Sequence, residues 1–146
     1  MRKIIVPIMI TLLFLTGCPN PPSPEQLKPP QATVRVDNKQ ITTRQGSFCW
    51  SEGGAGVCQD AIPPDEIAKK LKPTTVKPKS RLTIQFHRPP KKGSLGVNLW
   101  KDHKPQTVQV VNNVIGLPDR PGVYVYDFFA EWEQGSASYV FVVEVK

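Results

Sequence analysis

Two long β-forming stretches close the sequence, and a short turn separates them. Residues 122–132 are rich in aromatic and β-branched side chains, and residues 138–145 return to the end of the chain after a turn at Gly135 and Ser136. A pair of this kind buries its apolar side chains only by packing against further elements. The sequence therefore predicts a mainly β domain.

Several shorter segments upstream alternate apolar or β-branched residues with polar ones. These segments are residues 32–36, 40–43, 46–50, 81–87, 95–100, 107–111 and 114–115. In the fourth of these, Leu82, Ile84 and Phe86 are expected to face inward. Because Pro89 to Gly93 has turn-forming composition, the segments on either side of it are predicted to pair as a hairpin.

One helix is predicted over residues 63–71. Prolines stand at its start, acids fill its first turn and lysines its last, an arrangement that complements the helix dipole. Ile67, Ala68 and Leu71 would form its apolar face. Together with about seven strands over roughly 110 residues, this helix fits an antiparallel β-sandwich.

Residues 119–124, with the sequence Asp-Arg-Pro-Gly-Val-Tyr, resemble the approach to the late strands of immunoglobulin-like and fibronectin-like domains. In those domains a tyrosine near the strand start bonds back to the upstream backbone, and Tyr124 matches it by position. Cys49 and Cys58 are too close in sequence to form the inter-sheet bridge of antibody domains. The resemblance implies an Ig-like sandwich over residues 32–146 that is not antibody-like.

Residues 1–17 have the pattern of a secretory signal. Arg2 and Lys3 precede an apolar run whose helix would span roughly 18 Å, against about 30 Å for the hydrocarbon core of a bilayer. The run ends in Leu15-Thr16-Gly17-Cys18, which resembles the lipobox of bacterial lipoproteins. In that family the cysteine receives a diacylglyceryl group and becomes the first residue after cleavage.

The lipobox resemblance implies that Cys18 is lipidated, with palmitate-type acyl chains that anchor the protein at the extracytoplasmic face of the cell membrane. An ordinary cleaved signal with a chance cysteine is the alternative. Residues 18–31 contain six prolines and are expected to form an extended tether with a reach on the order of 40 Å. A proline-rich ligand for another domain is the second interpretation of this segment.

Removal of residues 1–17 would leave 129 of the 146 residues, with 17 basic and 12 acidic side chains and a net charge of +5. Such a surface suits anionic partners, and no pattern of aromatic and arginine residues indicates nucleic acid. Nine basic residues are concentrated in one quarter of the chain: Lys69, Lys70, Lys72, Lys77, Lys79, Arg81, Arg88, Lys91 and Lys92. They would bind an anionic wall polymer or lipid headgroups, or they simply form a solvated face.

With Cys18 lipidated, Cys49 and Cys58 form an even pair in a compartment that permits disulfides. The glycines between them allow a tight reversal, so a disulfide is expected, with two thiols as the alternative. The segment Gly46-Ser47-Phe48-Cys49-Trp50, followed by glycines and the second cysteine, resembles small lipoproteins of Gram-positive bacteria. This resemblance implies no activity.

The sequence offers little for catalysis. His87 and His103 are the two candidate bases for neutral pH, and neither lies beside a candidate nucleophile in sequence. No ligand spacing typical of zinc, no phosphate-binding loop and no nucleophile elbow occurs, so neither an enzyme nor a cofactor or metal is expected.

Three tryptophans, Trp50, Trp100 and Trp132, form either a platform for stacking sugars or part of the core. Trp132 lies between Glu131 and Glu133, and it is expected to be the most exposed of the three. With Arg88, Lys91 and Lys92, these tryptophans are the candidate ligand-binding residues.

These features predict a lipid-anchored, non-catalytic binding or accessory domain for a protein or cell-wall component. A second hypothesis is an inhibitor of an extracellular hydrolase, acting through the loop from Cys49 to Cys58 or the turn from Pro89 to Gly93, because a preorganised loop binds at lower entropic cost. A third is a structural protein of the wall space that binds anionic polymers by its charge.

Overall fold

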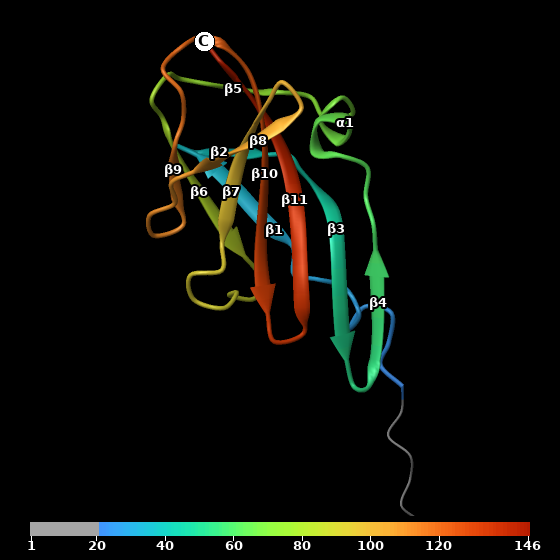
Figure 1. Ribbon diagram of the computed structural model, residues 1–146. Coiled ribbons are helices and arrows are strands. Elements are labelled where there is room, and N and C mark those ends of the chain that lie inside the picture. Colours follow the sequence, from blue (N-terminus) through green and yellow to red (C-terminus); the bar gives the residue numbers. More distant parts are fainter. Residues whose placement is uncertain (1–20) are drawn as a thin grey trace, which may run out of the picture.

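The computed structural model describes residues 21–146, in which eleven strands and one helix form two packed sheets (Figure 1). The expected mainly β sandwich with one short helix is confirmed, with more strands than the seven expected. The predicted signal segment 1–17 and the predicted lipidation site Cys18 lie outside the described residues.

The smaller sheet has four strands in the order β2-β1-β6-β9, and all its pairs are antiparallel. Its strands are β1 (Ala32–Val36), β2 (Lys39–Ile41), β6 (Arg81–Phe86) and β9 (Val114–Gly116). Leu82 and Ile84 of β6 are fully buried and Phe86 packs against the core, as the alternation of this segment predicts.

The larger sheet has the order β4-β3-β11-β10-β7-β8, with β5 added in parallel to the end of β11. Its strands are β3 (Thr43–Glu52), β4 (Ala55–Gln59), β5 (Thr74–Val76), β7 (Gly96–Lys101), β8 (Lys104–Val108), β10 (Gly122–Trp132) and β11 (Gly135–Val145). The closing hairpin expected from the sequence is therefore β10 and β11, paired over their whole length.

The hairpin expected from residues 81–87 and 95–100 is wrong. β6 pairs with β1 and β9 in the smaller sheet, whereas β7 pairs with β10 and β8 in the larger one. The chain from His87 to Leu95 crosses from one sheet to the other. Alternation determines which side chains of a strand are buried, and it does not determine the neighbouring strand.

The helix α1 (Pro64–Ala68) is shorter than the expected 63–71, because the segment after Ala68 continues as a turn, with Lys69 still at helical dihedrals and the backbone N–H of Leu71 donating to the carbonyl of Ala68 at 2.9 Å. Pro64 stands in its first turn, where a missing backbone N–H costs nothing. Ile67 and Ala68 are buried on the outer face of the larger sheet, where Val140 and Val142 of β11 complete a small apolar cluster.

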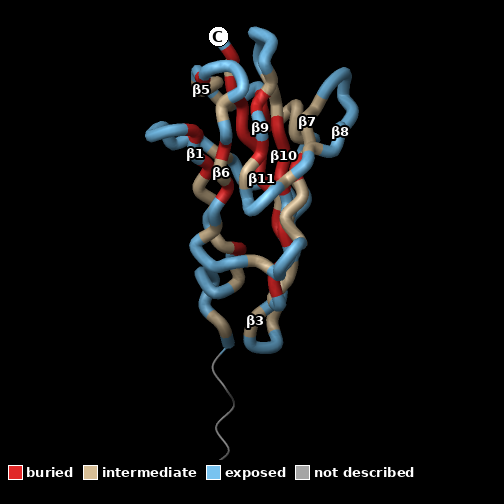
Figure 2. The backbone as a smooth tube through the Cα atoms, turned by 90° about the vertical axis from the view of Figure 1, so that its left-hand side faces the viewer, coloured by how far each residue is buried: buried red, intermediate tan, exposed pale blue. Residues whose placement is uncertain are grey.

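The main core lies between the two sheets, where the buried stretches of β10 and β11 face β1 and β6 (Figure 2). Aromatic rings fill its centre. Tyr126 stacks on Phe141 at a centroid distance of 5.0 Å, and Phe128 stacks on Tyr139 at 5.1 Å. The hydroxyl of Tyr124 donates a hydrogen bond to the carbonyl of Arg120 at 2.9 Å, so the expected tyrosine-corner bond is present.

The described part of the tether is not extended throughout. A turn occupies Pro24 to Leu27, with the backbone N–H of Gln26 donating to the carbonyl of Ser23 at 2.9 Å. Pro29 is buried, and the hydroxyl of Tyr139 donates to the carbonyl of Pro30. The expected extended path is therefore wrong over Pro24 to Leu27, where local hydrogen bonds form a turn instead.

The tether joins the domain at one end of the sandwich, which we name the tether pole. Three turns meet there: β3–β4 around Gly53, β10–β11 around Gln134, and the crossing that begins at His87 (Figure 1). The opposite end, named the distal pole, holds β5, α1 and the C-terminus. Because β11 has eleven residues, the poles are separated by about 33 Å.

Candidate functional site

The three tryptophans do not form a common platform. Trp50 and Trp132 lie inside the sandwich, 1% and 3% exposed, with their ring centroids 5.5 Å apart. Trp100 pairs with Val125 on the outer face of the larger sheet and is half-buried. Recognition of a sugar by all three rings together is therefore not possible in this fold.

The expectation that Trp132 is the most exposed tryptophan is wrong. Its indole N–H donates to the carbonyl of Arg88 at 2.9 Å, and its ring packs edge-on against Phe86 at 5.1 Å. The neighbouring glutamate Glu131 is exposed because successive side chains of a strand point to opposite faces. Trp132 shares the inward face of β10 with Tyr126, Phe128 and Ala130.

Trp100 belongs to a polar cluster on the outer face of the larger sheet. Its indole N–H donates to the carboxylate of Asp127, which also accepts from the side-chain amide of Asn98 at 3.3 Å. Asp127 is only 7% exposed, and its burial raises its pKa although the two hydrogen bonds act in the opposite direction. Both donors occupy β7, so this carboxylate joins β10 to its neighbour.

Cys49 and Cys58 are joined by a disulfide that lies between directly paired residues of β3 and β4, with Cα atoms 4.0 Å apart. The expected loop between the cysteines is a β-hairpin, with its turn at Gly53 and Gly54, both at positive φ. β4 has no strand on its other side within the described residues. The disulfide therefore attaches an edge strand covalently to the sheet.

The nine basic residues that cluster in the sequence do not cluster in space. Arg81 and Phe86 are the two ends of β6, so this strand carries the chain about 17 Å from the distal pole to the tether pole. The candidate residues Arg88, Lys91 and Lys92 follow β6 at the tether pole, and the guanidinium of Arg88 lies 5.7 Å from the Trp50 ring centroid. The six remaining residues, Lys69, Lys70, Lys72, Lys77, Lys79 and Arg81, belong to the distal pole.

Acidic residues balance the cations of the tether pole in number. Lys91 forms an ion pair with Glu133 at 3.6 Å, and the backbone N–H of Lys91 donates to the carbonyl of Glu131 at 2.7 Å. Including Lys28, four basic residues stand against four acidic ones at this pole: Glu25, Glu52, Glu131 and Glu133. No net charge remains there to attract an anionic surface.

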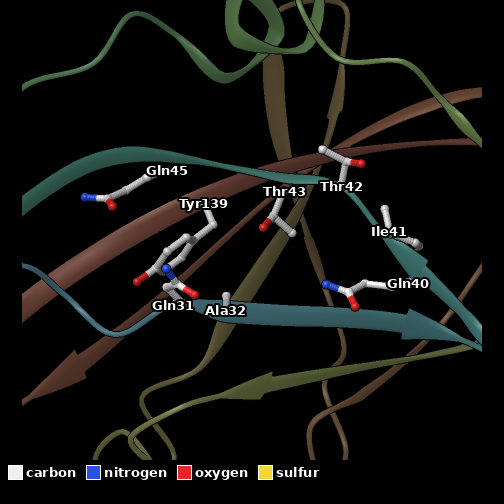
Figure 3. A pocket seen from close by; sticks show the side chains of 8 residues that line it. All are labelled: Gln31, Ala32, Gln40, Ile41, Thr42, Thr43, Gln45 and Tyr139. Carbon is white, nitrogen blue, oxygen red and sulfur yellow. The ribbon is translucent and has the colours of Figure 1, made fainter.

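A cleft of about 570 Å³ opens at the side of the sandwich where the chain passes from β2 to β3 (Figure 3). Amide and hydroxyl side chains dominate its lining: Gln31, Gln40, Thr42, Thr43 and Gln45, with Ala32, Ile41 and Tyr139 completing it. Tyr139 is buried, and its hydroxyl is already bonded to the carbonyl of Pro30. The cleft suits a neutral polar ligand, and its lining residues contain no acid–base pair.

The two histidines lie apart and do not complete a catalytic arrangement with one another. His103 contacts the carboxylate of Asp65 in α1, and this hydrogen bond lowers the pKa of Asp65. His87 is exposed after β6, and its backbone N–H donates to the carbonyl of Gln31 at 3.0 Å. Among residues 21–146, no group of three or more metal-ligating side chains lies together, and no helix is long and apolar enough to span a bilayer.

Comparisons with protein-family models, with curated proteins and with solved structures found no match to this chain.

Proposed function

We propose that this chain is a lipid-anchored, extracytoplasmic binding or accessory domain that holds a protein or a cell-wall component without catalysis. The proposal rests on the lipobox resemblance at Leu15 to Cys18, and on the way in which the tether meets the domain. A lipid on Cys18 would be connected through thirteen residues to the first strand.

The observation that carries the proposal is the fixed attachment of the tether at one pole. Pro22 approaches Gly53 in the β3–β4 turn, Pro29 is buried, and Pro30 accepts the Tyr139 hydroxyl. A tether held in this way gives an anchored domain a preferred orientation, with the distal pole away from the membrane. A surface that is presented outward suits capture of a partner.

A disulfide between exposed Cys49 and Cys58 supports the extracytoplasmic part of the proposal, because cytosolic thiols are kept reduced. The disulfide-closed hairpin is also the observation that favours the second candidate, a hydrolase inhibitor. Its turn at Gly53, however, lies at the tether pole, where an anchored protein would face its own membrane. The binding domain is therefore the preferred proposal.

The anchor is tested by growing cells that express the full chain with radiolabelled palmitate, and then separating membrane and soluble fractions. The native chain is expected to carry label and to stay in the membrane fraction, whereas Cys18→Ser should lose both properties. A Cys49→Ser/Cys58→Ser variant is the matched control, since it removes cysteines without touching the lipobox. Label that persists in Cys18→Ser would refute the anchor.

A further inference from the structure

The positive charge of the domain is concentrated at the distal pole. Eleven basic residues gather there: Lys39, Lys69, Lys70, Lys72, Lys77, Lys79, Arg81, Lys101, Lys104, Arg120 and Lys146. Six acidic residues accompany them: Asp37, Asp65, Glu66, Asp102, Asp119 and Glu144. Eleven minus six gives +5, which equals the net charge of 17 basic and 12 acidic residues in the described chain.

Contacts between distant segments bring these charges to one end. The ammonium of Lys39 donates to the carbonyl of Thr75 at 3.3 Å, and the backbone N–H of Lys146 donates to that of Val76 at 3.2 Å. The backbone N–H of Lys79 donates to the carbonyl of Pro118 at 3.1 Å. The β1–β2 turn, β5, the segment before β10 and the C-terminus therefore meet at this pole.

Most of the cations there are not neutralised by neighbours. Only three of the eleven form ion pairs with described residues: Lys69 with Glu66, Lys79 with Asp119, and Lys146 with Glu144. All eleven side chains are exposed. Of the other eight, Lys39 donates to the carbonyl of Thr75, and the remaining seven form neither an ion pair nor a side-chain hydrogen bond with described residues.

We infer that the distal pole, named here the basic pole, binds a polymer that carries regularly spaced phosphate or carboxylate groups. The inference names the partner of the binding domain proposed above and rests on that proposal for its cellular setting. Exposed cations that are spread over several elements can each contact a different charged group of a polyanion. A single small anion would reach only a few of them. The anchored orientation turns this pole away from the headgroups of the protein's own membrane.

The test measures binding of the purified full chain to long-chain inorganic polyphosphate and to poly-L-glutamate across a range of salt concentrations. Lys70→Gln/Lys72→Gln/Lys77→Gln removes three cations of the basic pole that form no ion pair with described residues. Arg88→Gln/Lys91→Gln/Lys92→Gln is the matched control, since it removes the same charge at the tether pole.

The native chain should bind at least one of the two polymers, with an affinity that falls steeply as salt rises. The basic-pole variant should lose about tenfold or more in affinity and about two units of the slope of log K against log salt, with little change in the control. Preference between the two polymers then distinguishes a phosphate from a carboxylate partner. Circular dichroism of both variants verifies that the fold is retained.

Equal losses in the two variants, or binding that salt does not weaken, would overturn the inference. Tighter binding to phosphatidylglycerol vesicles through the same lysines would also overturn it, because the partner would then be a membrane. The outcome is independent of the anchor test, since failure of Cys18→Ser to release the protein would leave polymer binding by the purified chain unchanged.

Discussion

Trp132 shows how a residue expected to bind a ligand instead stabilises the core. Its side chain is 3% exposed, packs on Trp50 and Phe86, and satisfies the Arg88 carbonyl. Truncation of a buried aromatic side chain removes the transfer free energy and leaves a cavity. Trp132 therefore stabilises the fold at the tether pole.

Trp132→Ala is expected to lower the free energy of unfolding by about 3–5 kcal/mol, measured by urea denaturation. Phe129→Ala is the matched control on the same strand, because Phe129 is 44% exposed on the opposite face, and its loss should be about 1 kcal/mol or less. Similar losses in the two variants would contradict the assignment of Trp132 to the core.

Asp127 should make the free energy of unfolding depend on pH, and the sign of this dependence can be predicted. Burial raises its folded-state pKa above the ordinary value of 3.8, so the folded protein holds this proton more tightly than the unfolded chain. The tighter binding of this proton adds to the free energy of unfolding. That contribution is fully present below pH 3.8 and is lost as the pH rises through the folded-state pKa. Asp127→Asn removes the titration while keeping one acceptor oxygen.

The stability of the native chain relative to Asp127→Asn should therefore fall from acid pH towards neutral pH, as followed by urea denaturation at a series of pH values. Glu131→Gln, an exposed position on the same strand, should leave the pH dependence unchanged. Parallel stability profiles for the native chain and Asp127→Asn would show that burial does not perturb this carboxylate.

At the scale of the elements, the hairpin of β3 and β4 depends on its disulfide. Among the described strands β4 pairs with β3 alone, and none of its side chains (Ala55–Gln59) is buried. Cys49→Ser/Cys58→Ser should cost about 2.5–3 kcal/mol on the chain-entropy account. Amide exchange of β4 should accelerate more than that of β10 in this variant, because β4 then also opens locally, and equal acceleration of both would contradict a local role.

Gly135 fixes the alignment of β11 against β3. Its φ is +151°, and an added Cβ would lie 2.0 Å from the carbonyl oxygen of Cys49, which is backbone and has little freedom to move. Gly135→Ala should therefore lower the free energy of unfolding by about 3 kcal/mol or more.

Gly96→Ala provides a matched comparison for Gly135→Ala in thermal or urea unfolding. A Cβ at Gly96 would meet only the end of the half-exposed Phe129 ring, which can rotate away. Its expected cost is about 1 kcal/mol. A Gly96→Ala variant less stable than Gly135→Ala would contradict the close backbone approach at Gly135.

The strands were predictable where alternation is clear, as in β6 and the last part of β10, because period-two burial is a property of the segment itself. β4 was not predictable, since Ala-Gly-Val-Cys-Gln has no alternating apolar pattern and pairs only because β3 and the disulfide hold it. The same alternation, extended from Tyr126 to Trp132, would have placed Trp132 inside. The acidic neighbours Glu131 and Glu133 were misleading, because they suggested that Trp132 is exposed as well.

At the scale of the whole molecule, distance along the chain misrepresents distance in space. The basic residues from Lys69 to Lys92 lie close together in the sequence. In space they belong to two poles, because β6 runs from one pole to the other between Arg81 and Phe86. Cations from distant segments, such as Lys39, Arg120 and Lys146, complete the basic pole instead. Only the pairing of strands reveals this arrangement, and beyond the closing hairpin that pairing was not predicted correctly from the sequence.

The proposed orientation of the anchored domain, with its basic pole facing outward from the membrane, can be measured in cells. It is tested most directly on intact cells with an amine-reactive reagent too polar to cross the cytoplasmic membrane, followed by mass spectrometry of each lysine. Rates measured on the purified full chain correct for intrinsic reactivity. Lys70, Lys72 and Lys77 should be modified faster than Lys91 and Lys92. Absence of modification at both poles would contradict the extracytoplasmic location, and the reverse order would contradict the orientation.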